Sequence, residues 1–164
     1  MPSSFEPFEQ AMRDLAQRLA SRQQLRESVL SRLILHVATS MADSMDAPLK
    51  KHGLNSTLWT SLVVIYAAEG HRLKPSELSV FMNSSRTNST RVAKELERQG
   101  FVERIGSDLD RRQVFLQLTP KAMEFVTENM PRRRAQLKEM FESFEPEEVD
   151  EFERLLRKML TRFT

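Results

Sequence analysis

The residues best suited to chemistry lie in one polar stretch with the composition of a helix start. They combine hydroxyl, amide and cationic side chains: Ser84, Ser85, Arg86, Thr87, Asn88, Thr90, Arg91 and Lys94. The N-terminus of a helix attracts phosphate through its free N–H groups and its dipole, and its first turns fit the DNA major groove. The hydroxyls would bind phosphate, whereas arginine would contact guanine, asparagine adenine and the threonine methyl thymine. The competing interpretation is a solvated helix face with ordinary capping.

A second candidate is the polar loop that carries Asp110, Arg111 and Arg112. Arginine at a loop tip would enter the minor groove, where narrow geometry strengthens the attraction for a cation. A free carboxylate would be unfavourable against phosphate, so we expect Asp110 to pair with an arginine and hold the tip. Alone, such a loop is typical of a solvated turn. Together with the basic helix start, it favours DNA binding.

A third candidate site is small and lies nearer the N-terminus. Arg32 and His36 lie one helical turn apart, and Thr39 continues the same arc, which we expect to lie beside apolar surface that packs against Trp59. A cation beside aromatic surface would suit a small aromatic carboxylate, and a histidine would make its affinity depend on pH. A solvated or salt-bridging face between helices is the alternative.

Helical periodicity dominates the elements that must position these residues. Apolar side chains recur at steps of three and four over residues 5–19 and 30–45, and Pro48 and Gly53 would end the second of these helices. Further helices are expected over residues 54–68, 75–82 and 87–99.

The period then changes to two, which predicts strands over residues 101–105 and 114–118 joined by a protruding polar hairpin. Thr119 is expected to cap the next helix, with Pro120 at its first position. Pro131 should kink or interrupt that helix.

This order predicts a mostly α fold with a small β-hairpin (α+β), namely a winged helix-turn-helix flanked by dimerisation helices. We assign residues 1–53 to N-terminal dimerisation helices, 54–119 to the winged helix-turn-helix and 120–164 to C-terminal dimerisation helices. The flanking helices carry more apolar surface than so small a module covers, so we expect a homodimer.

Composition excludes several classes of function. The 164 residues carry 25 Lys and Arg against 23 Asp and Glu, and they include no cysteine and three scattered histidines. Disulfides, thiolate metal centres and cysteine nucleophiles are therefore excluded, and no metal cluster is suggested. No Gly-rich phosphate loop, nucleophile elbow or zinc motif occurs, so we expect no enzyme, catalytic residue, cofactor or metal. Without a long apolar run or a secretory signal, a soluble cytoplasmic protein with no membrane partner is expected.

Several of these segments together resemble the MarR family of transcription regulators, nearest to its multidrug-efflux repressor branch. They are Pro75–Leu78, Ser84–Asn88, Leu96–Arg104, Asp110–Arg112 and Leu118–Thr119, and the similarity extends from about Phe5 to Leu160. The resemblance implies a winged-helix homodimer that binds inverted-repeat operators in double-stranded DNA. It also implies release from the operator when a small aromatic acid or related phenolic ligand binds.

By position, the resemblance makes residues 86–94 the major-groove helix and Arg112 the wing-tip arginine, braced by Asp110. Two positions depart from the family pattern. Ala122 stands where many members have glycine, and Glu145 stands where a serine commonly caps the last helix. The sequence therefore predicts a ligand-responsive repressor, and a winged-helix protein-interaction module that does not bind DNA is the alternative.

Overall fold

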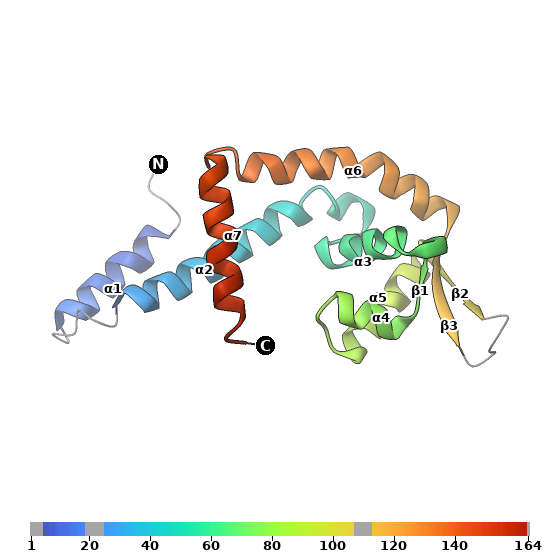
Figure 1. The fold of residues 1–164 in the computed structure, drawn as a ribbon, viewed down its shortest axis with the longest axis horizontal. Helices are drawn as coiled ribbons and strands as arrows, with labels where there is room; N and C mark the ends of the chain where they lie inside the picture. The colour runs from blue at the N-terminus through green and yellow to red at the C-terminus, as the bar shows by residue number, and fades with distance from the viewer. Residues whose placement is uncertain (1–4, 19–24, 107–112, 164) are drawn as a thin grey trace. The chain divides into compact units, whose positions relative to one another are not determined.

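The computed structural model describes residues 5–18, 25–106 and 113–163, which form seven α-helices and three strands (Figure 1). The chain divides into two units, residues 1–59 and 60–164. Within the described ranges, no helix combines the length and the apolar character needed to cross a membrane.

The first unit is built on two helices, α1 (Glu6–Arg18) and α2 (Leu25–Asp46), which pack on each other. Phe5, just before α1, is buried, and its ring lies 5.4 Å from that of Phe8. By contrast, α2 leaves a row of large apolar side chains between 37% and 59% exposed: Leu30, Leu33, Ile34, Leu35 and Val37. This helix therefore offers more apolar surface than α1 covers.

The start of α3 (Ser56–Ala67) is fixed by side-chain caps from two residues. The Asp46 carboxylate accepts the backbone N–H of Ser56 at 2.6 Å, and Asn55 Oδ1 accepts the N–H of Leu58 at 2.9 Å. These bonds satisfy N–H groups that the first turn of a helix leaves without partners.

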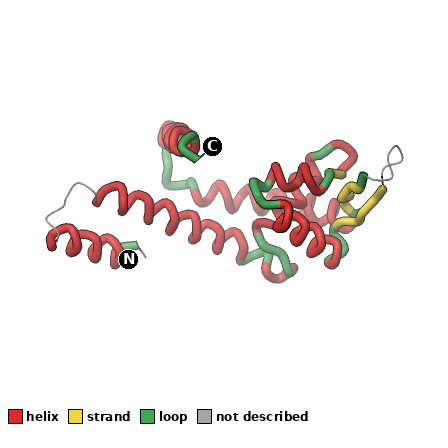
Figure 2. The backbone as a smooth tube through the Cα atoms, turned by 90° about the horizontal axis from the view of Figure 1, so that it is seen from below, coloured by secondary structure: helices red, strands yellow, loops and turns green. Residues whose placement is uncertain are grey.

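The second unit continues from α3 into a helix-turn-helix followed by a β-hairpin. Its elements are β1 (Arg72–Leu73), α4 (Pro75–Phe81), α5 (Arg86–Arg98), β2 (Val102–Gly106), β3 (Val114–Leu118), α6 (Pro120–Met140) and α7 (Pro146–Leu160). The strands form an antiparallel sheet in the order β1-β3-β2, drawn in yellow in Figure 2. This is the expected winged helix-turn-helix layout.

The core of this unit joins the helices to one face of the sheet. Its largest fully buried apolar side chains are Leu62, Ile65, Leu78, Leu96, Leu116 and Val126. Because side chains alternate along a strand, burial of Leu116 and Leu118 on β3 leaves Phe115 and Gln117 on the other face. The core therefore fixes α4, α5 and the hairpin as one body.

The predicted helices and both hairpin strands are confirmed. Thr119 caps α6 by accepting the N–H of Ala122 at 3.3 Å, as expected. Gly100 follows α5 with a left-handed φ of 71°, which favours glycine. Alternation did not identify β1, because two residues are too few to establish a period.

Of the two outcomes expected at Pro131, a kink or an interruption, the interruption is wrong, since α6 runs through Pro131 to Met140. A proline inside a helix removes one backbone hydrogen bond, and the remaining turns of this 21-residue helix hold it together.

Candidate nucleic-acid interface

The turn between α4 and α5 determines how the candidate helix start is presented. Asn83 adopts a left-handed φ of 44°, a conformation that asparagine tolerates better than most residues. The chain then extends at Ser85, whose Oγ accepts the backbone N–H of Asn88 at 3.2 Å. Ser85 is therefore the N-cap of α5. Because a cap of this kind satisfies one N–H group, other N–H groups of the first turn remain available to a ligand.

The two faces of α5 differ sharply. One face is buried and comprises Ser89, Val92, Ala93 and Leu96. The opposite face is exposed and carries the predicted DNA contacts Arg86, Thr87, Thr90, Arg91 and Lys94. The buried face holds the helix on the core, so the exposed side chains are presented by a fixed backbone.

Two predicted base contacts are joined to each other. Arg91 Nη2 donates to Asn88 Oδ1 at 3.1 Å, one helical turn away. The bond orients the guanidinium and leaves the amide nitrogen of Asn88 as a donor. These two side chains therefore form a single polar unit on the exposed face.

Three of the hydroxyl side chains in this region, those of Ser84, Ser85 and Thr90, differ in availability. Thr90 Oγ1 donates to the carbonyl of Arg86 at 2.8 Å, which commits the hydroxyl and leaves the methyl group exposed for contact. Ser85 uses its oxygen as an acceptor and keeps its proton to donate. Ser84 Oγ is covered and forms no hydrogen bond among the described residues, so a phosphate contact from Ser84 requires another rotamer.

The charges of α5 are distributed unevenly along its length. Near the C-terminal end, hydrogen bonds from Arg98 and Gln99 lower the pKa of Glu95 to about 2, and the same pairing raises the pKa of Arg98. Within the described residues, Arg86, Arg91 and Lys94 form no ion pair. The cations of α5 that form no ion pair therefore lie between Arg86 and Lys94, before the paired Arg98 at the C-terminal end.

The hairpin extends the same body beside α5. Its strands pair from Val102 with Leu118 to Gly106 with Val114. Asp110, Arg111 and Arg112, the predicted tip contacts, lie outside the described residues. Their roles stay a prediction.

The predicted ligand residues lie in the first unit, where two of them, Arg32 and His36, contact aromatic rings in or just before α1. Arg32 Cζ lies 5.7 Å from the centre of the Phe8 ring, and the His36 ring lies 5.5 Å from that of Phe5. Sequence reasoning missed these aromatic partners, although their spacing of three on an amphipathic helix was a usable signal.

The other two predicted ligand residues are less available. Thr39 Oγ1 donates to the Leu35 carbonyl at 2.9 Å, so its hydroxyl proton is already engaged. Trp59 is only 6% exposed. Arg32 and His36 are therefore the better candidates for contact with a polar ligand.

Comparisons of the sequence identify relatives along nearly the whole chain. Residues 54–114 match the family model described as the MarR family. The chain is 40% identical to the transcriptional repressor MprA of Escherichia coli K12 over 162 residues, which cover 99% of this chain and 92% of that protein. It is 29% identical to the HTH-type transcriptional regulator PapX of E. coli, over 92% of this chain and 96% of that protein.

Solved structures share the fold. The Streptomyces coelicolor regulator Sco3205 in complex with DNA matches with a TM-score of 0.76 and 23% identity, over 82% of this chain and 86% of that one. A mutant of E. coli MarR complexed with operator DNA matches with a TM-score of 0.74 and 23% identity, over 85% of this chain and 99% of that one. Both matches confirm the predicted winged-helix architecture.

Proposed function

The chain belongs to the MarR family, whose members are transcription regulators and not enzymes, and from this premise we propose that it is a ligand-released repressor. In this proposal a homodimer binds a palindromic operator in double-stranded DNA. A small aromatic acid or phenolic compound then lowers the affinity for the operator. The relative that matches at 40% identity is itself named a transcriptional repressor.

The observation that carries the proposal is the division of α5 into a buried apolar face and an exposed basic, hydrogen-bonding face. Arg86, Arg91 and Lys94 supply cations for phosphate or guanine, and Asn88 supplies an amide for adenine. The solved structures with DNA have the same fold and contain DNA as a partner. We therefore assign major-groove contact to residues 84–94 and minor-groove contact to Arg111 and Arg112, with Asp110 as a brace.

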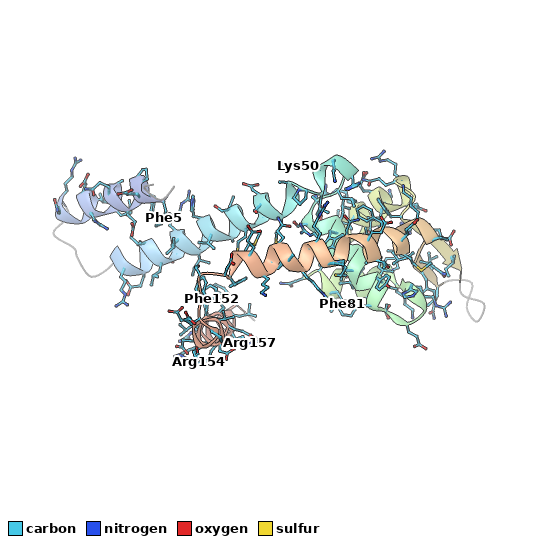
Figure 3. The ribbon with its side chains drawn as sticks, turned by 90° about the horizontal axis from the view of Figure 1, so that it is seen from above. Phe5, Lys50, Phe81, Phe152, Arg154 and Arg157 are labelled. Carbon is cyan, nitrogen blue, oxygen red and sulfur yellow. The ribbon has the colours of Figure 1, made fainter. Side chains whose placement is uncertain are left out.

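The proposed homodimer rests on exposed apolar surface. No residue of α7 is buried. Its large apolar side chains are between 39% and 57% exposed: Phe152, Leu155, Leu156, Met159 and Leu160. Figure 3 views α7 with Phe152 on a different side from Arg154 and Arg157. Pairing of such faces by two-fold symmetry would set two recognition helices on half-sites about 10 bp apart.

The proposed effector site is centred on Arg32 and His36. A carboxylate would pair with the guanidinium of Arg32, and an aromatic ring would lie against Phe5 and Phe8. Release from DNA requires the effector to bind the DNA-free conformation more tightly than the DNA-bound one. Competition between the ligand ring and α1 for the same surface would supply such a difference.

The deciding experiment is selection of bound sequences from random duplex DNA, with and without benzoate or salicylate. We expect an inverted repeat to be enriched and the acid to reduce its recovery. An unchanged yield with both acids, and an Arg32→Ala variant that responds like the wild type, would remove the effector assignment. Failure to bind any duplex at low ionic strength would favour the protein-interaction module instead.

A further inference from the structure

The wing sheet has an outer face that presents an aromatic ring and two cations. On β1, Leu73 is buried and pairs with Leu116, whereas Arg72 pairs with Gln117 on the opposite, outer face. The same register continued by one residue places Lys74 across from Phe115. We call Arg72, Lys74 and Phe115 the sheet patch.

The ring organises both cations of the sheet patch. Arg72 Cζ lies 5.1 Å from the centre of the Phe115 ring, and Lys74 Nζ lies 5.6 Å from it. Both distances fall within the range of cation–π attraction, which is electrostatic and restricts the mobility of each side chain. Two positive charges are thus held close together on one half-buried ring.

Two carboxylates near the sheet patch, those of Glu77 and Glu103, leave both charges available. Glu77 accepts the backbone N–H of Lys74 at 2.8 Å and so caps α4. Glu103 faces the same side of the sheet, one strand beyond Gln117, at a separation of about 10 Å across two strand spacings from Arg72. Among the described residues, neither Arg72 nor Lys74 forms an ion pair.

The sheet patch lies where two parts of the DNA-binding module meet. Lys74 immediately precedes α4, the first helix of the helix-turn-helix, and Phe115 lies on β3, a strand of the wing. A duplex that contacts both parts presents its backbone phosphates between them. Phosphate is the complementary charge for two organised cations, and DNA is the partner that brings several phosphates at fixed spacing.

We propose that Arg72 and Lys74, held by Phe115, bind the DNA backbone beside the recognition helix. This inference rests on the proposed function and adds a phosphate site that the polar face of α5 does not include. Contacts to phosphate carry no sequence information but fix the protein on the duplex. The sheet patch therefore contributes affinity and salt dependence, equally for every sequence that α5 reads.

The test compares salt dependence of duplex binding, measured by fluorescence anisotropy, in three variants with the wild type. Removing one phosphate contact should reduce the slope of log K against log salt by about 0.9 and weaken binding about eightfold near 0.1 M salt. We expect Arg72→Ala and Lys74→Ala each to lose one such contact in every subunit that is bound to the duplex. Phe115→Leu should keep both charges and weaken binding about two- to fivefold, because only the cation–π orientation is lost.

Arg98→Ala is the matched control, since it removes one exposed positive charge from the same unit and Arg98 is paired with Glu95. It should leave the slope unchanged. Lys74→Arg, which keeps the charge, should retain binding, and thermal unfolding should show that each variant is folded. If Arg72→Ala and Lys74→Ala match the Arg98→Ala control while the wild type binds the duplex, the sheet patch is not a phosphate site and the proposed function stands. If the wild type itself binds no duplex, both proposals fail.

Discussion

α5 and α7 are both amphipathic, but they leave opposite faces uncovered. α5 buries its apolar residues in its own unit and exposes hydroxyl, amide and cationic groups. α7 buries nothing and exposes Phe152, Leu155 and Leu156 at 39–47%. In the first pattern, the apolar face of the helix is covered within its own unit, and the polar face is available to a charged partner. The second describes a helix whose apolar face is satisfied only by association.

The same contrast appears in the charges of the two helices. On α7, Arg154 pairs with Glu151 and Arg157 pairs with Glu153, both at 2.6 Å. On α5, pairing is confined to the C-terminal half, where Arg98 binds Glu95. Cations that pair within their own helix are poor phosphate ligands, whereas Arg86, Arg91 and Lys94 of α5 form no ion pair among the described residues. The comparison thus separates a proposed protein interface from a proposed DNA interface.

The largest effect is expected from Leu155→Asp on α7. A carboxylate placed in a proposed apolar dimer interface costs at least about 3 kcal/mol, or more than a hundredfold in association. Sedimentation at micromolar concentration should then show monomers, and operator binding should weaken with the loss of the second half-site.

Arg154→Gln is the matched control for this change, because it alters charge on a different side of α7. It should leave the protein dimeric. A dimer that persists in Leu155→Asp would show that the exposed face of α7 is not the contact between subunits. α7 could then no longer be contrasted with α5 as a protein interface.

The next effect concerns base recognition by the exposed face of α5. Asn88→Ala and Arg91→Ala should each cost about 1–3 kcal/mol at the base pair they contact and relax preference there. Because Arg91 Nη2 donates to Asn88 Oδ1, the double variant should lose at least about 0.5 kcal/mol less than the sum. Competition binding with single-base operator variants measures both quantities. Strict additivity would mean that the two side chains separate when DNA binds.

Periodicity and capping residues were sufficient to predict the helices, both hairpin strands and the recognition helix from the sequence. Ser85, Thr119 and Gly100 are strong local signals because each satisfies a specific backbone requirement at a helix end. Contacts between segments that are distant in the sequence were harder to predict. The contact of Arg72 and Lys74 with Phe115 depends on the register of a two-residue strand. Two residues are too few to show the alternation of apolar and polar side chains that identifies a strand in a sequence.

The proposed effector site illustrates the same limit. Arg32 and His36 were grouped by helical spacing, since residues one turn apart share a face. Their aromatic neighbours Phe8, in α1, and Phe5, just before it, come from another segment, and packing decides which segment covers that face. Helical spacing within α2 carried no information about that choice.

A smaller effect should separate the two roles of Ser85 at the start of α5. Ser85→Ala removes the cap and should cost about 1 kcal/mol of unfolding free energy, with a fall in Tm of about 2–4 °C. Ser85→Asp keeps a cap acceptor and should preserve Tm, yet its negative charge would repel phosphate and weaken DNA binding. Thr119→Ala, which removes the cap of α6, should lower Tm without changing the salt dependence of DNA binding. Equal DNA binding by Ser85→Asp and the wild type would place the duplex away from this helix start.

The smallest expected effect is a pH dependence of stability caused by the Glu95–Arg98 pair near the C-terminal end of α5. Hydrogen bonds from Arg98 and Gln99 lower the pKa of Glu95 from 4.5 to about 2 in the folded chain. A carboxyl whose folded pKa is depressed stabilises the fold above its unfolded pKa, and that stabilisation disappears as pH falls from about 4.5 toward 2. Since the pair is exposed, solvent and salt screen it and the change in stability is small. Urea midpoints between these pH values should fall more steeply for the wild type than for Glu95→Gln, and identical slopes would mean that Arg98 is not held by Glu95 in solution.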